Sequence, residues 1–219
     1  HTWQAALRAA GAGCHAVDLV MSGECENAFC AVRPPGHHAE KANPMGFCFF
    51  NNIGVAARHA LKKHGLERVA IIDFDVHHGN GTEDCFAGDD QVLMCSIFQH
   101  PFYPYCGTEK PAANMCNVPL AAGCGGEEFR DAVLQVWTPR LKEFKPQMIF
   151  ISAGFDGHYE DDMGGLKLLE KDYAWCTEHL KKLAAEMCDK RIVSMLEGGY
   201  VMTSLARSVG AHLRVLADL

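Results

Sequence analysis

Short apolar segments rich in β-branched residues alternate along the chain with segments in which apolar residues recur every three or four positions. Continuous apolar runs of this length are typical of strands buried on both faces of a parallel sheet. The expected strands are Ala28–Arg33, Arg68–Phe74, Val92–Ile97, Gln147–Ala153 and Arg191–Leu196. The expected helices are Gln4–Met21, Asn52–His64, Glu127–Phe144, Glu170–Cys188 and Thr203–Leu216. This alternation predicts an α/β fold with an open, mostly parallel sheet and helices on both faces.

The length and composition favour a single domain, or one incomplete larger domain, over residues 1–219. Hydrophobic residues make up 48% of the chain and charged residues 21%, close to the average for globular proteins and sufficient for a sizeable core. No internal repeat or low-complexity linker divides the sequence.

The charge and cysteine content exclude several classes of protein. The formal net charge is -7 and Lys and Arg do not cluster, so direct nucleic-acid binding is not expected, whereas a cationic substrate suits this balance. The 11 cysteines include no C-x-x-C pair, and no signal-peptide pattern is present, which together favour a reducing cytoplasm. No apolar stretch approaches the ~18 residues of a membrane-spanning helix, so membrane insertion is not expected.

Polar residues gather where four of the expected strands end. The segments that follow these strands are Pro34–His38, Asp73–Gly81, Gly154–Asp156 and Glu197–Tyr200. Open α/β sheets place their sites beyond the carboxyl ends of the strands, so these segments are expected to converge on one crevice.

Three of these residues form a candidate metal site. Asp75 and His77 lie two positions apart on an extended segment, so their side chains point to the same side. Asp156 from a neighbouring strand end would complete an Asp/His/Asp set. Three protein ligands with an open fourth position are typical of catalytic zinc, although oxygen-rich ligation also admits Fe(II) or Co(II).

The same crevice offers candidates for acid–base and electrostatic roles. A metal-activated water needs a group that removes its proton and a group that protonates the leaving amine. We expect His37 with Asp73 to be the charged, electrostatic pair, and His38 with Asn80 to be the general base and acid. Tyr200 follows two glycines and is expected to donate its hydroxyl to the developing oxyanion.

With these residues in place, the chain resembles the histone deacetylase superfamily, especially its class II and bacterial deacetylase-like members. The motifs that carry the resemblance are Arg33–Ala39, Gly46–Asn52, Asp73–Thr82, Gly154–Asp156 and Glu197–Tyr200. The resemblance implies an arginase-like fold, zinc on Asp75, His77 and Asp156, tandem histidine catalysis, and polarisation of an amide carbonyl by Tyr200. It also implies a cytoplasmic, bacterial-type hydrolase that acts on an acylated lysine or amine.

The resemblance implies two further sets of residues. The walls of a narrow acyl-lysine tunnel would be formed by Phe47, Tyr103, Gly154 and Gly199. A structural potassium ion would be held by backbone oxygens of Asp73, Asp75, His77, Ser96 and Ile97. A second potassium site would involve Phe86 and Val92.

Catalytic domains of this family begin further upstream, with two more strands and a substrate-gripping loop. We therefore expect the first strands to be absent here and Ala28–Arg33 to form an exposed sheet edge. Because exposed edges recruit partners, a homo-oligomer is expected.

Three functions are compatible with these residues. A zinc-dependent deacetylase acting on acetyl-lysine is the first. An acetylpolyamine amidohydrolase is the second, although the absence of a long insertion between Ile97 and Asn114 favours a more open deacylase. A non-catalytic remnant that binds metal or acyl-lysine is the third.

Overall fold

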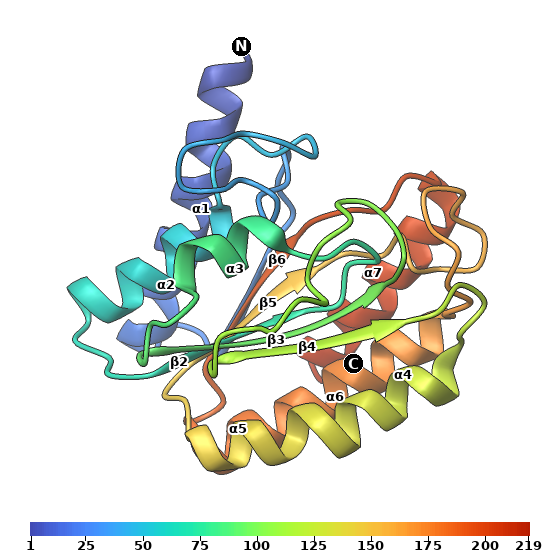
Figure 1. Ribbon diagram of the computed structural model, residues 1–219. Coiled ribbons are helices and arrows are strands. Elements are labelled where there is room, and N and C mark those ends of the chain that lie inside the picture. The colour runs from blue at the N-terminus through green and yellow to red at the C-terminus, as the bar shows by residue number, and fades with distance from the viewer.

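The computed structural model describes residues 1–219 and contains a six-stranded parallel sheet with helices on both faces (Figure 1). The strands are β1 (Asn27–Cys30), β2 (Val69–Asp73), β3 (Val92–Gln99), β4 (Met115–Leu120), β5 (Ile149–Ala153) and β6 (Ile192–Leu196). Their order across the sheet is β1-β6-β5-β2-β3-β4, and every neighbouring pair is parallel. The predicted open α/β sheet is confirmed.

The helices form two layers with separate hydrophobic cores. They are α1 (Thr2–Ser22), α2 (Asn52–Lys63), α3 (Asn80–Phe86), α4 (Gly126–Ala132), α5 (Thr138–Phe144), α6 (Glu170–Met187) and α7 (Met202–Leu216). Along β2, Val69 and Ile71 face the core formed with α1, α2 and α3, whereas Ala70 and Ile72 face the core formed with α4 to α7. Figure 1 shows these helix groups on opposite faces of the sheet. No helix combines the length and apolar character needed to cross a membrane.

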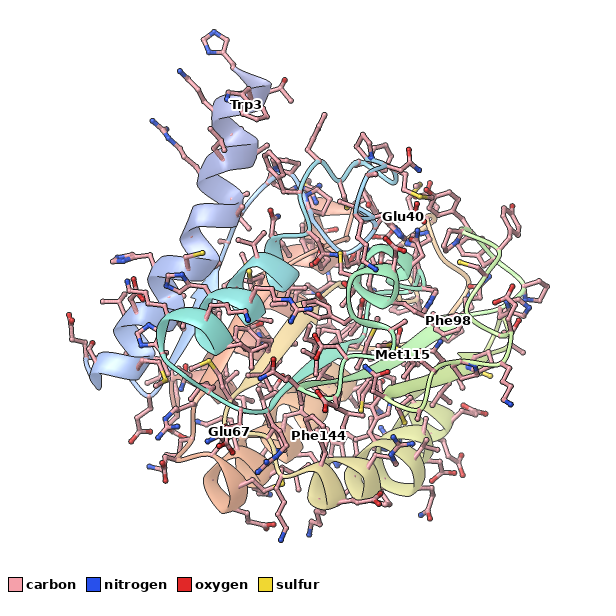
Figure 2. The ribbon with its side chains drawn as sticks, turned by 60° about the vertical axis from the view of Figure 1, so that its left-hand side comes forward. Trp3, Glu40, Glu67, Phe98, Met115 and Phe144 are labelled. Carbon is pink, nitrogen blue, oxygen red and sulfur yellow. The ribbon has the colours of Figure 1, made fainter.

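The first turns of α1 extend beyond the sheet toward the N-terminus, as Figure 1 shows. Trp3, labelled in Figure 2 on this extension, packs edge-on against Phe50 with ring centroids 5.5 Å apart. This contact joins the start of α1 to the loop between β1 and α2.

Several elements differ from the expected ones. The first strand covers Asn27–Cys30 rather than Ala28–Arg33, because the chain leaves the sheet as it approaches Pro34. Strand β4 was not predicted: it contains Pro119, which cannot donate to a ladder and is tolerated at a sheet edge. The short helix α3 was also missed, since seven residues carry too little periodicity to be recognised.

The helix expected over Glu127–Phe144 is interrupted by a π-helical segment, η1 (Val133–Trp137), between α4 and α5. Pro139 lacks the N–H that would bind the carbonyl of Gln135, so regular α-helical bonding fails here. The backbone N–H of Thr138 instead reaches Val133 O, and the Thr138 hydroxyl donates to the same oxygen at 2.8 Å.

The sheet topology creates a crevice between β2 and β5. These strands are neighbours, but the chain proceeds from β2 to β3 and β4 on one side and from β5 to β6 on the other. Such a switch point leaves space beyond the carboxyl ends of the two strands, where ligands bind in open α/β folds. β1 pairs only with β6, so it forms one edge of the sheet, as expected.

Candidate active site

The segments expected to converge do so at this switch point. Asp73 is the last residue of β2, and Asp75 and His77 follow it directly. Asp156 follows β5, and Gly198 to Tyr200 follow β6. The loop after β1 brings His37 and His38 beside them, with a 3.0 Å contact between His37 Nδ1 and Asp73 Oδ2.

Asp75, His77 and Asp156 are all buried, and the structure brings one ligand atom of each within 4.8 Å of the others. His77 Nδ1 lies 3.0 Å from Asp75 Oδ1 and 3.3 Å from Asp156 Oδ2. The second oxygen of each carboxylate is positioned by a backbone N–H, from Gly198 to Asp75 at 2.8 Å and from Val76 to Asp156 at 2.9 Å. These backbone hydrogen bonds therefore fix the orientation of both carboxylates relative to His77.

The electrostatics of this group fit a divalent cation. Burial disfavours the ionised form of Asp75, but His37 and the hydrogen bond with His77 outweigh it, so the pKa of Asp75 lies below its usual range. Burial and the adjacent Asp75 charge raise the pKa of Asp156 to about 6. Asp156 Oδ2 is buried without a hydrogen-bond partner. A cation beside it would satisfy this oxygen and relieve the repulsion between the two carboxylates.

His37 lies in an anionic environment. In addition to its bond with Asp73, its Nε2 lies 3.7 Å from Asp75 Oδ1. Burial alone would lower the pKa of His37, but the charges of Asp73 and Asp75 raise it well above the ordinary value. The two carboxylates therefore favour the protonated form of His37.

The surroundings of His38 favour its neutral form instead. Its Nδ1 lies 2.8 Å from Asn80 Oδ1, and the Asn80 Nδ2 donates to Glu40 Oε1 at 2.8 Å. Because the amide nitrogen faces Glu40, labelled in Figure 2, the amide oxygen must face His38 and accept the Nδ1–H. Burial and the neighbouring charge of His37 lower the pKa of His38 to about 3. The Nε2 of His38 is left with a free lone pair.

The site opens into a cavity of about 540 Å³. Of the predicted tunnel residues, Phe47 and Tyr103 line it together with Tyr200. The rings of Phe47 and Tyr200 lie 6.1 Å apart, and Tyr103 is edge-on to His38 at 5.2 Å. Five further lining residues were not predicted from the sequence, namely Gly46, Phe102, Tyr105, Asp162 and Met163.

Two predicted tunnel residues lie elsewhere. Gly154 is not among the cavity-lining residues; a Cβ placed on it would lie 2.1 Å from Asp75 Oδ2. Gly199 has φ of +130° and lies against Leu205. Both glycines allow close approach of the backbone around the carboxylates and Tyr200, and neither forms a wall of the cavity.

Glu197 is a further buried residue of this crevice, and no role for it was predicted from the sequence. Its buried carboxylate accepts hydrogen bonds from the backbone N–H of Gly36 at 2.7 Å and of His37 at 3.1 Å, and from Ser152 Oγ at 3.0 Å. Burial raises its pKa to about 7. A Glu directly after a buried apolar strand is the signal that could have identified it, since such a charge needs partners.

The residues expected around potassium lie on β2, on β3 and in the loop after β2. Asp73 and Ser96 are in register on these strands, and Ser96 Oγ is buried without a hydrogen-bond partner. Asp75, His77 and Ile97 lie close by in the chain. At the second expected site, Asn114 Nδ2 donates to the carbonyl oxygens of Phe86 and Val92 at 2.8 and 2.9 Å. A side-chain amide thus satisfies these two oxygens.

Comparison with known proteins agrees with this geometry. Residues 1–216 match the histone deacetylase domain family. The chain belongs to the histone deacetylase family. It is 41% identical to "Histone deacetylase 14, chloroplastic" of Arabidopsis thaliana over 98% of its length, and 37% identical to "Polyamine deacetylase HDAC10" of Homo sapiens over 98%.

A solved structure described as the HDA15 HD domain superposes with a TM-score of 0.92 and 36% identity, covering 98% of this chain and 62% of that one. This chain spans only 53% of the Arabidopsis relative and 33% of the human one. These relatives come from a plant and an animal, so the comparison does not single out a bacterial origin.

Proposed function

We propose that the chain is a zinc-dependent deacetylase that hydrolyses the acyl-amide bond of acetyl-lysine or a similar acylated amine. The observation that carries this proposal is the position of the Asp75, His77 and Asp156 group beside a cavity that also contains His38 and Tyr200. Each group that amide hydrolysis requires is present within this one crevice.

Asp75, His77 and Asp156 would hold the zinc ion, and His77 also lines the cavity. When bound, zinc lowers the pKa of water toward neutrality and polarises the acyl carbonyl. The unpartnered Asp156 Oδ2 and the shared anionic charge support a cation here. Nearby backbone oxygens of Asp73, Asp75, His77, Ser96 and Ile97 are proposed to hold potassium.

The two histidines would divide the proton chemistry between them. His38 is neutral and donates from Nδ1 to Asn80, so its Nε2 can accept the proton of the attacking water and deliver it to the leaving amine. His37 keeps its positive charge through Asp73 and stabilises the negative charge that develops on the acyl group. The Tyr200 hydroxyl would donate a hydrogen bond to the carbonyl oxygen.

The cavity would accommodate an aliphatic chain that carries an acyl group. Phe47, Phe102 and Tyr103 give it apolar walls, which suits the methylene groups of an acyl-lysine side chain. Asp162 also lines the cavity and favours a second cationic group on the substrate. This carboxylate is the observation that keeps an acylated polyamine as the second candidate substrate.

Turnover assays with purified, zinc-loaded protein test the proposal. We expect hydrolysis of an acetyl-lysine peptide, and a fall of about 10²–10³ in kcat for Tyr200→Phe at unchanged zinc content, as for loss of one oxyanion donor. A parallel assay with an acetylated polyamine ranks the two substrates by kcat/KM. Zinc binding without hydrolysis of either substrate would instead identify a non-catalytic metal-binding domain.

Two further features concern the cellular compartment of the chain and its assembly. All 11 cysteines are free thiols in the structure, which supports a reducing compartment such as the cytoplasm. The outer edge of β1 has no strand partner, which supports self-association through this side. Light scattering at micromolar concentration distinguishes a dimer from a monomer.

A further inference from the structure

A second group of potential metal ligands lies between α1 and α2, away from the crevice. Its members are Asp18 on α1, His59 on α2, and His64, which caps the C-terminus of α2. Asp18 Oδ1 lies 2.8 Å from His59 Nε2 and 2.7 Å from His64 Nε2. One ligand atom from each residue lies within 4.8 Å of the others.

The group is partly exposed to solvent, and several nitrogen groups contact the single carboxylate of Asp18. The exposed fractions of the His59, His64 and Asp18 side chains are 22%, 21% and 34%. Lys63 Nζ lies 2.9 Å from Asp18 Oδ2, so three nitrogen groups surround a single carboxylate. Hydrogen bonds from Lys63, His59 and His64 lower the pKa of Asp18 far below its usual range.

We propose that Asp18, His59 and His64 form a second binding site for a divalent transition-metal ion of the zinc type, which links α1 to α2. Two imidazoles and one carboxylate are a donor set that zinc accepts, and solvent can fill the fourth position because all three side chains are partly exposed. The site does not depend on the proposed deacetylase activity.

Only a small rearrangement is needed to admit the ion. Ligand atoms around tetrahedral zinc lie roughly 3.3 Å apart, given bond lengths of about 2.0–2.2 Å. The present separations from Asp18 Oδ1 would therefore widen by about half an ångström. Both histidines would shift their proton to Nδ1 so that Nε2 offers a lone pair. Asp18 Oδ2 could keep its contact with Lys63.

Equilibrium dialysis of the full chain at micromolar zinc, with metal analysis, tests the proposal. The double variant His59→Gln/His64→Gln is expected to bind one zinc ion fewer per chain than the parent. His15→Gln is the matched control, because His15 lies exposed on α1 and is not a member of the group. Circular dichroism confirms that each variant is folded.

A second variant tests the site without disrupting it. Lys63→Gln removes the positive charge beside Asp18, which would repel a bound cation, so zinc affinity at this site should rise about 2- to 5-fold, the equivalent of one exposed ion pair. An equal zinc content in the parent and the double variant would overturn the proposal. So would an equal loss in His15→Gln, or unchanged or weaker zinc binding in Lys63→Gln.

Discussion

The Asp161 carboxylate accepts a hydrogen bond of 2.7 Å from the backbone N–H of Tyr200. The same oxygen accepts from the Val201 N–H at 3.2 Å, and the other oxygen accepts from the Met163 N–H at 3.0 Å. Asp161 is 4% exposed, so these bonds are shielded from water. The loop after β5 thereby fixes the position of the tyrosine that follows β6.

Removal of the Asp161 carboxylate should therefore displace the Tyr200 hydroxyl from its catalytic position while the tyrosine itself remains. Asp161→Ala is expected to lower kcat by about 10- to 100-fold, since a displacement of about 1 Å in a reacting group can cost this much. Zinc content should be unchanged. In a Tyr200→Phe background the same substitution should lower kcat by less than about threefold, because the two residues act together. Fully multiplicative losses would show that Asp161 acts through something other than Tyr200.

The neutral amide of Asn80 is expected to be essential for the state of His38. Asn80→Asp would place a carboxylate 2.8 Å from the His38 ring and raise the pKa of His38 from its low value of about 3. More of the enzyme would then carry a protonated His38 that cannot accept a proton. The acidic limb of the pH profile of kcat/KM should shift toward higher pH by about one unit or more. An unchanged acidic limb would remove His38 from the role of base.

Outside the crevice, His212 should make folding stability depend on pH. Its Nδ1 lies 2.6 Å from Thr177 Oγ1 and its Nε2 lies 2.9 Å from Ser194 Oγ, and burial lowers its pKa to about 3. In the unfolded chain His212 takes up a proton as the pH falls below about 6.5, whereas in the folded chain it stays neutral down to about pH 3. The contribution of His212 to the free energy of unfolding is therefore complete above pH 6.5 and is lost as the pH drops toward 3.

His212→Gln removes this titration. The parent should lose about 2 kcal/mol more than the variant between pH 7 and pH 5, at about 1.4 kcal/mol per unit below pH 6.5. Urea unfolding at the two pH values measures the difference, and the exposed His15→Gln serves as the control. Equal losses in the parent and His212→Gln would show that His212 is not the source.

The sequence identified the sheet well because the buried strands are uninterrupted apolar runs. β2, β5 and β6 were located to within two residues at each end. Strand β4 was not recognised because this edge strand contains Asn117 and Pro119, so its sequence is not an uninterrupted apolar run. The π-helical segment depends on how Pro139 is accommodated, which periodicity alone does not reveal.

Residues of the crevice were predictable where they stand immediately after a strand, as Asp75 and Asp156 do. The residues that support them were not. Glu40 and Asp161 lie in loops, and their roles depend on contacts with Asn80 and Tyr200, which are about 40 positions away in the chain. Such long-range hydrogen bonds leave no local pattern in the sequence.

Zinc-dependent turnover of an acetyl-lysine peptide is the most direct measurement of the proposed function. Protein stripped of metal by a chelator should lose activity by more than about 10³-fold and regain it on addition of zinc, because the metal supplies the largest part of the electrostatic stabilisation. Asp156→Ala should remain inactive after the same addition. Activity that survives both the chelator and Asp156→Ala, or a zinc-loaded parent that hydrolyses no acylated amine, would contradict a catalytic zinc on Asp75, His77 and Asp156.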